Sequence, residues 1–178
     1  MTSAAHLKAL VRTISDFPKP GIEFHDITTL LLDRVGLAGA VDALAASVTG
    51  PIDLVAGVEA RGFAIGGALA IKLGAGLLLI RKDGKLPGKT IAEDYALEYG
   101  TDRLAMHVDA VAPGARVLVV DDLIATGGTA LAAVRLVRRA GGIVVGARFI
   151  IDLPSLGGRV ALEADGIDAL SLMAFEGV

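Results

Sequence analysis

The chain contains no cysteine among its 178 residues, and this absence excludes disulfides, thiolate nucleophiles and cysteine-based metal sites together. Long apolar runs are also missing. Although 53% of the residues are hydrophobic, the longest runs, such as residues 74–80, are far shorter than a membrane span. The first residues, MTSAAHLKALVRT, lack the apolar core of a signal peptide. We therefore expect one cytoplasmic domain that covers residues 1–178 and contacts no membrane.

Several other classes of function are disfavoured by what the sequence does not contain. The formal net charge is −3, from 17 basic and 20 acidic residues, which argues against a nucleic-acid-binding surface. Neither G-x-x-x-x-G-K-[ST] nor G-x-G-x-x-G occurs, so a nucleotide hydrolase or dinucleotide-binding domain is a weak candidate. No His, Asp and Glu residues have metal-ligand spacing, so we expect no metal held by the protein alone.

Short aliphatic runs alternate with segments of helical periodicity along the chain. Residues 54–58, 77–80, 117–120 and 143–151 are typical of buried strands, with a last strand over 170–175. Helical spacing covers residues 4–14, 36–48, 63–73 and a segment that begins near Gly128. Residues 83–102 have weak periodicity and are expected to form a long excursion that is partly loop. This alternation predicts an α/β fold with a central, mostly parallel twisted sheet flanked by helices.

Polar residues follow three of the predicted strands directly. They are Glu59 and Arg61 after the first, Arg81 and Lys82 after the second, and Asp121 and Asp122 after the third. Because ligands bind at the carboxyl ends of parallel strands, all three sets should lie along one edge of the sheet. The segment Thr126-Gly127-Gly128-Thr129 then opens a helix, which is the layout of a phosphate-binding turn. Such a site suits a sugar phosphate, with separated phosphates and hydroxyls between them.

Each of these features also has an ordinary explanation when it is taken alone. A Gly-Gly pair before a helix is often only a tight turn. The Asp121-Asp122 pair is compatible with helix capping, a metal site of the nucleotide-hydrolase kind or a phospho-acceptor pocket. Arg61 and the basic run at residues 81–85 are compatible with solvated surface charge. His6 and His107 are best explained as structural, whereas His25, beside Asp26, stays open.

Five segments together resemble one protein family. VLVVDDLIATGGT resembles the phosphoribosyl-pyrophosphate (PRPP) signature of the type I phosphoribosyltransferases. FPKPGIEFHDITTLL, GVEARGF, IRKDGKLPGKT and YALEYGTD resemble the adenine-specific branch of that family, and the segments span residues 17 to about 152 in the family's order. The resemblance implies the type I phosphoribosyltransferase fold, with a small hood contributed mainly by residues 17–32 and a mobile lid loop at about residues 90–100.

The resemblance also implies an activity. It is the transfer of 5-phosphoribosyl from PRPP to adenine, giving AMP and pyrophosphate in purine salvage, with Mg²⁺ bound through PRPP and with the enzyme acting as a homodimer. The alternatives are a phosphoribosyltransferase for another purine or for orotate, and a non-catalytic PRPP-sensing regulator. The regulator ranks lower because the chain has neither the spare length nor the basic charge of a nucleic-acid-binding module.

Residue roles carry over onto matching positions only. The resemblance assigns the 5-phosphate to Ala125, Thr126, Gly127, Gly128 and Thr129. It assigns pyrophosphate to Glu59, Ala60, Arg61, Arg81, Lys82 and Lys85, with a cis peptide between Glu59 and Ala60. It places adenine against Ile22, Glu23, Phe24 and His25, with base recognition by backbone groups, and assigns the lid Tyr95, Glu98 and Tyr99. The implied catalytic residues are Glu98, which shuttles the purine proton, with Arg61 and the ribose-binding pair Asp121 and Asp122.

Overall fold

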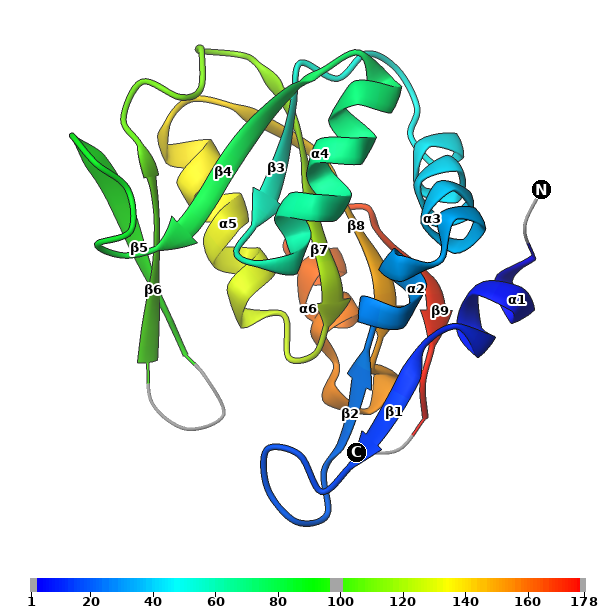
Figure 1. Ribbon diagram of the computed structural model, residues 1–178. Helices are drawn as coiled ribbons and strands as arrows, with labels where there is room; N and C mark the ends of the chain where they lie inside the picture. The colour runs from blue at the N-terminus through cyan, green and yellow to red at the C-terminus, as the bar shows by residue number, and fades with distance from the viewer. Residues whose placement is uncertain (1–2, 97–100, 177–178) are drawn as a thin grey trace.

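The computed structural model describes residues 3–96 and 101–176 and contains a seven-stranded sheet in the order β5-β6-β4-β3-β7-β8-β9 (Figure 1). Five neighbouring strands are parallel, and β6 and β5 continue the sheet in antiparallel pairing. The bounds are β3 Leu54–Val58, β4 Gly76–Lys82, β5 Thr90–Ala96, β6 Thr101–His107, β7 Arg116–Ile124, β8 Ile143–Asp152 and β9 Ala169–Ala174. The predicted α/β fold with a mostly parallel sheet is confirmed.

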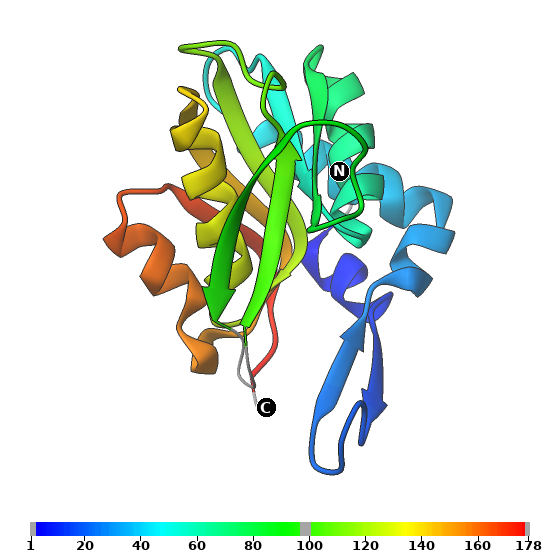
Figure 2. The same ribbon diagram turned by 90° about the vertical axis from the view of Figure 1, so that its left-hand side faces the viewer.

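Helices cover both faces of this sheet. Helices α3 and α4 lie on one face, whereas α5 and α6 lie on the other (Figures 1 and 2). The bounds are α1 Ala4–Ala9, α2 Thr28–Leu32, α3 Arg34–Ala46, α4 Arg61–Leu73, α5 Gly128–Arg139, α6 Gly158–Ala164 and a 3₁₀ turn η1 at Pro154–Leu156. Among the described residues no helix is both long and apolar enough to cross a membrane.

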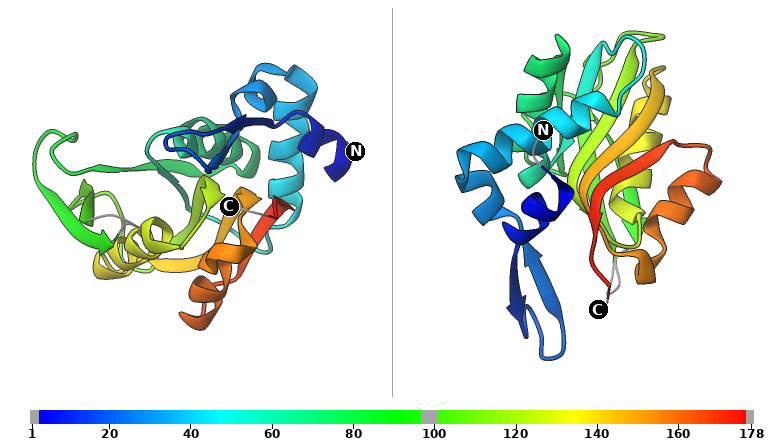
Figure 3. Two further views of the ribbon diagram at one scale, coloured as in Figure 1. Left: turned by 90° about the horizontal axis from the view of Figure 1, so that it is seen from below. Right: turned by 90° about the vertical axis from the view of Figure 1, so that its right-hand side faces the viewer.

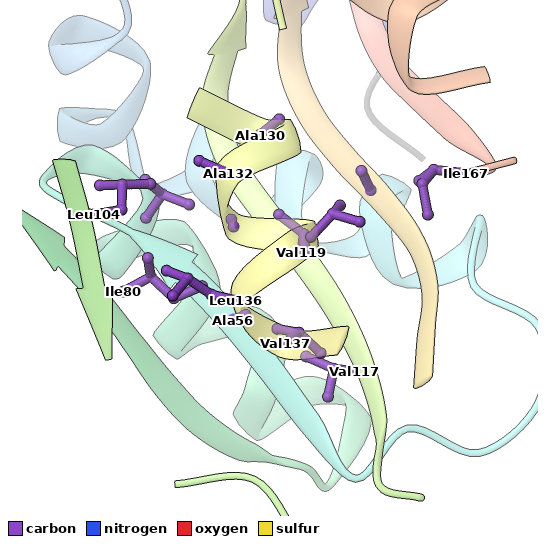
Figure 4. Packing of buried hydrophobic residues seen from close by; sticks show 14 of the residues in the cluster. Ala56, Ile80, Leu104, Val117, Val119, Ala130, Ala132, Leu136, Val137 and Ile167 are labelled. Carbon is purple, nitrogen blue, oxygen red and sulfur yellow. The ribbon is translucent and has the colours of Figure 1, made fainter. Parts of the chain in front are cut away.

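Strand β7 separates two hydrophobic cores. Val117 and Val119 belong to the core under α5, while Leu118 and Val120 belong to the core under α3 and α4. Figure 4 shows Leu136 and Val137 of α5 together with Val117 and Val119 in the first core. Successive strand residues point to opposite faces, so the aliphatic run predicted as a strand is buried on both sides. Burial of each such side chain stabilises the fold by about 1.5–3 kcal/mol.

Two glycines let α4 begin very close to the sheet. A Cβ atom on Gly57 of β3 would lie 2.7 Å from the carbonyl oxygen of Gly62, and a Cβ atom on Gly62 would lie 2.9 Å from that of Val120 in β7. Any larger residue at either position would push the helix away from the strands. The close approach brings Arg61, the first residue of α4, over the end of β7.

The N-terminal helix predicted over residues 4–14 is partly wrong. Helix α1 ends at Ala9, and Arg12–Ser15 forms strand β1, which pairs antiparallel with β2, Glu23–Asp26. The helical spacing of the apolar residues misled the prediction, because Ile14 lies opposite Phe24 in a hairpin instead. An Arg12–Asp26 ion pair of 2.5 Å crosses this hairpin, which projects beyond the carboxyl edge of the sheet (Figure 1).

The excursion predicted over residues 83–102 is also more regular than its sequence suggests. Its second half contains β5 and the start of β6, which form a hairpin that packs on α5. Arg139 holds β5 there by donating to Glu93 at 2.8 Å and to the carbonyl of Ala92 at 2.8 Å. The predicted lid at about residues 90–100 therefore begins as a strand, and its residues Glu98 and Tyr99 lie outside the described residues.

Candidate functional site

The candidate site lies where the strand order reverses. The chain passes from β3 to β4 on one side and later places β7 on the other side of β3. Helices α4 and α5 leave from opposite faces there, and such a switch point is the usual ligand site of an open α/β sheet. Figure 3 shows this carboxyl edge from below. A cavity of about 440 Å³ opens at the edge.

Most of the predicted site residues line this one cavity. All three strand ends contribute, as their shared position at one edge predicts. From these segments the lining contains Glu59, Ala60, Arg61, Lys82, Asp121, Asp122, Ala125, Thr126, Gly127, Gly128 and Thr129, with Phe24, His25 and Tyr95 from the two hairpins. Ile22, Glu23, Arg81 and Lys85 were also predicted to bind ligand but are not part of the lining.

The acid pair lies inside β7 and not after it, because the strand continues to Ile124. Asp122 is buried, and its Oδ2 atom accepts a hydrogen bond from Nε of Arg61 at 2.5 Å. Burial and the Asp122 carboxylate together raise the pKa of Asp121 well above its usual range. The oxygen atoms of the pair can accept hydrogen bonds from hydroxyl groups. In its ionised form the pair can also stabilise positive charge that develops nearby, and the raised pKa of Asp121 means that this form requires a higher pH than an ordinary carboxyl does.

The glycine loop, residues 125–129, connects β7 to α5. Gly127 has a positive φ of +84°, which favours glycine, and α5 begins at Gly128 without a side-chain cap. The first amides of a helix have no partner within it, and together with the helix dipole they attract anions. The loop thus offers a phosphate site that contains no charged side chain.

Two basic side chains, Arg61 and Lys82, line the cavity, and we call them, together with the neighbouring Arg81 on β4, the cationic end. Arg81 contacts Glu59 through Nε at 3.2 Å, and the backbone N–H of Lys82 donates to the same carboxylate at 2.9 Å. Burial acts to raise the pKa of Glu59, but these donors outweigh it and the pKa is lowered. The Glu59-Ala60 peptide bond is cis, as the resemblance implies.

Lys82 has a carboxylate partner of its own. Its Nζ atom lies 2.9 Å from Oδ2 of Asp102, which also accepts a hydrogen bond from the Tyr95 hydroxyl at 3.2 Å. The Lys82 ammonium lowers the pKa of Asp102, and Asp102 in turn raises the pKa of Lys82. Each cation of the cationic end is thus paired with a carboxylate of the same chain.

The hairpin β1–β2 places two rings beside the cavity. Phe24 contacts Phe17 edge to face at 5.2 Å, and the Arg61 guanidinium lies 5.7 Å from the centroid of the Phe24 ring. His25, which the sequence left open, is buried and stacks on Phe175 at 4.1 Å. Burial lowers the pKa of His25. The arrangement gives the cavity one aromatic wall.

Asp102 and Phe149 were not predicted from the sequence, nor were the other lining residues Leu123, Ile124 and Ala130. Asp102 lies inside the segment YALEYGTD, and its position opposite Tyr95 in the β5–β6 pairing makes it the partner of both Tyr95 and Lys82. The sequence segment YALEYGTD was part of the family resemblance, but the role of Asp102, its last residue, becomes visible only from the pairing of β5 with β6. Phe149 of β8 lines the cavity beside Asp121, its register partner. Nothing in an aliphatic strand sequence distinguishes that position.

Comparison with known proteins adds a family to this geometry. Residues 31–163 match the model of the phosphoribosyl transferase domain. The chain is 59% identical over 172 residues to an adenine phosphoribosyltransferase of Parvibaculum lavamentivorans, covering 96% of this chain and 98% of the relative. It also superposes on the adenine phosphoribosyltransferase structure from Rhodothermus marinus, with a TM-score of 0.91, 50% identity, and coverage of 97% and 98%. The Saccharomyces cerevisiae enzyme, solved with an imino-altritol bisphosphate and adenine, gives a TM-score of 0.88 at 34% identity, with coverage of 96% and 98%.

Proposed function

The chain belongs to the adenine phosphoribosyltransferase family, and from this premise we propose that it transfers the 5-phosphoribosyl group of PRPP to adenine. The products are AMP and pyrophosphate. The observation that carries the proposal is that a single cavity contains an uncharged phosphate loop, a carboxylate pair and a cationic end. PRPP needs these three parts in that order, for its 5-phosphate, its ribose and its pyrophosphate.

In this proposal the glycine loop holds the 5-phosphate. The backbone N–H groups of residues 125–129 and the hydroxyls of Thr126 and Thr129 donate to the phosphate oxygens. Donors that are fixed before the ligand arrives cost little reorganisation on binding. The loop therefore serves as the anchor from which the ribose extends toward the acid pair.

The acid pair holds the reacting sugar. Asp121 and Asp122 accept hydrogen bonds from the two ribose hydroxyls and favour the positive charge that develops as the bond from C1 to pyrophosphate breaks. The bonding electrons leave with pyrophosphate. The adenine nitrogen N9 then bonds to C1 and loses its proton, and the resemblance assigns that proton to Glu98, which lies outside the described residues.

The cationic end receives the leaving group. Arg61 and Lys82 line the cavity, and Arg81 is one residue away on β4. No group of three His, Asp or Glu side chains in residues 3–96 and 101–176 could enclose a metal ion. We therefore assign Mg²⁺ to the substrate: it would arrive chelated by the pyrophosphate of PRPP, and the cationic end would contact pyrophosphate oxygens rather than the ion.

The aromatic wall is the place for adenine. Phe24 packs near the base, and backbone groups of residues 22–25 recognise its edge. Backbone recognition separates a 6-amino purine from a 6-oxo purine, because a donor that faces the wrong substituent stays unpaired at a cost of about 1–3 kcal/mol.

The wider setting follows from the family. We propose that residues 1–178 act as one domain in cytoplasmic purine salvage, with residues 17–32 as a hood, residues 90–100 as a lid, and a homodimer as the active form. Leu32 on α2 and Ile71 on α4 are 84% and 85% exposed, and such apolar side chains are candidates for an interface between subunits. Sedimentation analysis should give twice the mass of the 18.1 kDa chain.

The decisive experiment is a purine panel. Pyrophosphate release is measured with PRPP, Mg²⁺ and, in parallel, adenine, hypoxanthine, guanine, xanthine and orotate. Adenine should be the best acceptor by about 5- to 150-fold, since an unpaired buried donor costs about 1–3 kcal/mol. Equal or higher activity with a 6-oxo purine or orotate would remove the adenine assignment. Binding of DNA or RNA without any turnover would favour the PRPP-sensing regulator instead.

A further inference from the structure

The segment that follows β8 supports the glycine loop from outside the cavity. The backbone N–H of Leu153 donates to the carbonyl of Ile124 at 3.0 Å, and the N–H of Gly158 donates to the carbonyl of Ala125 at 2.9 Å. Arg159 then pairs with Asp152 at 3.5 Å. The support segment, residues 153–159, is thus tied at two backbone positions to the chain that enters the loop and by one ion pair to β8.

At Gly158 the two backbones are in direct contact. A Cβ atom on Gly158 would overlap the carbonyl oxygen of Ala125 and would lie 2.6 Å from the amide nitrogen of Gly127. In the other direction, a Cβ atom on Gly127 would lie 2.9 Å from the carbonyl oxygen of Gly158. The two nearest atoms to a Cβ on Gly158 are backbone atoms of the loop itself, so movement of the third neighbour, the Ile124 side chain at 2.8 Å, would not make enough room.

We propose that Gly158 is a positioning residue for phosphate binding. It fixes the peptide groups of the glycine loop by an N–H contact to Ala125 and by van der Waals contact with Gly127. The inference rests on the proposed function, in which that loop binds the 5-phosphate of PRPP. Gly158 does not itself line the cavity, so its effect passes through the backbone positions of the loop.

The neighbouring glycine provides a matched control. Gly157 has a positive φ of +73°, but a Cβ atom there would meet nothing within 4 Å. Gly157→Ala therefore strains the same turn without touching the loop, whereas Gly158→Ala places a methyl group against it. A third variant, Arg159→Gln, weakens the Asp152 contact and adds no atoms to the interface.

The test measures steady-state kinetics together with calorimetric binding of ribose 5-phosphate and of pyrophosphate. Gly158→Ala should raise KM for PRPP and the Kd of ribose 5-phosphate by about tenfold or more, with kcat within about threefold, because the loop contacts ground state and transition state alike. The Kd of pyrophosphate should not change. Gly157→Ala should match the parent in all of these constants, and Arg159→Gln should raise KM for PRPP about twofold.

Three results would overturn the inference. They are an unchanged Kd of ribose 5-phosphate in folded Gly158→Ala, an equal loss of pyrophosphate affinity in that variant, and the same rise in KM in Gly157→Ala. If Gly158→Ala does not fold by circular dichroism, an unchanged KM in Arg159→Gln also overturns it. Binding of ribose 5-phosphate can be measured without turnover, so the two proposals can fail separately. Inactivity toward every base would refute the proposed function. The ratio of the ribose 5-phosphate Kd in Gly158→Ala to that in the parent would still decide the role of Gly158.

Discussion

The two ends of the cavity to which we assign the phosphate and the pyrophosphate are built on different principles. The glycine loop relies on backbone geometry, since Gly127 and Gly158 touch and no charged side chain takes part. The cationic end relies on charged side chains, and each of them is already paired with Asp122, Glu59 or Asp102. In the proposed function the loop would therefore bind through shape that exists before the ligand arrives, whereas the cationic end would exchange one anionic partner for another. Changes in shape should act at the first end and changes in charge at the second.

The largest effect is expected at the acid pair, where the two ends meet. Asp121→Asn should lower kcat by about 100-fold or more, because a neutral amide stabilises developing positive charge poorly. The fold should be retained, since the amide oxygen can still accept the Asp122 N–H that Asp121 accepts at 2.8 Å. Turnover and thermal unfolding are the measurements, with Asp165→Asn, on the distant Arg138 pair, as the control. An unchanged kcat would make the pair structural and would break the division of the cavity proposed here.

The pH dependence of activity should follow Asp121 as well. Burial and Asp122 raise its pKa, so its charged form is lost at a higher pH than that of an ordinary carboxyl. kcat/KM for PRPP should therefore fall about tenfold per pH unit on the acid side of that raised pKa. The free energy of unfolding should change in the opposite direction. Because the pKa of Asp121 is higher in the folded than in the unfolded protein, its contribution to stability is complete at low pH and is lost as pH rises through the folded-state pKa.

The check is a pair of pH profiles, for kcat/KM and for the free energy of unfolding, in the parent and in Asp121→Asn. The variant should lose the acid limb attributed to Asp121 and should be as stable as the parent or more stable at neutral pH. An acid limb that persists unchanged in the variant would assign the titration to another group.

A smaller and opposite effect is expected at the cationic end. Asp102→Asn should tighten pyrophosphate binding about two- to fivefold, because Lys82 no longer has to leave a carboxylate at 2.9 Å, and an exposed ion pair of this kind contributes up to about 1 kcal/mol. Ribose 5-phosphate should bind as it does to the parent. Calorimetry with both ligands measures this, again with Asp165→Asn as the control. Weaker pyrophosphate binding would mean that Asp102 positions Lys82 for the ligand and does not compete with it.

The same contrast explains how far the sequence could predict the molecule. Strand and helix positions around residues 54–73 and 116–152 were predictable because continuous aliphatic runs and helical spacing report burial directly. The glycine loop and acid pair were predictable because they are contiguous. The ion pairs of Lys82 with Asp102 and of Arg61 with Asp122 depend on strand register and helix placement, and the contact between Gly127 and Gly158 joins residues 31 positions apart. The β1 and β5 strands were missed because hairpin pairing, not local periodicity, decides them.

The smallest expected effect is that of salt. Raising ionic strength from about 0.05 to 0.3 M shortens the Debye length about 2.4-fold. Attraction between solvent-exposed charges is therefore weakened severalfold, whereas hydrogen bonds from buried backbone donors change little. The Kd of pyrophosphate should therefore rise severalfold, and that of ribose 5-phosphate by less than about twofold. Titrations of both ligands at several salt concentrations, with chloride and acetate compared to exclude competition by one anion, measure the two slopes. Salt also screens the internal attraction of the cationic end to Asp102 and Glu59, and this partly offsets the loss of attraction to pyrophosphate. In Asp102→Asn one of these internal attractions is absent, so the Kd of pyrophosphate should rise more steeply with salt concentration than in the parent. Equal slopes for the two ligands would mean that the glycine loop also binds through long-range charge, and the distinction between a shape-based end and a charge-based end would fail.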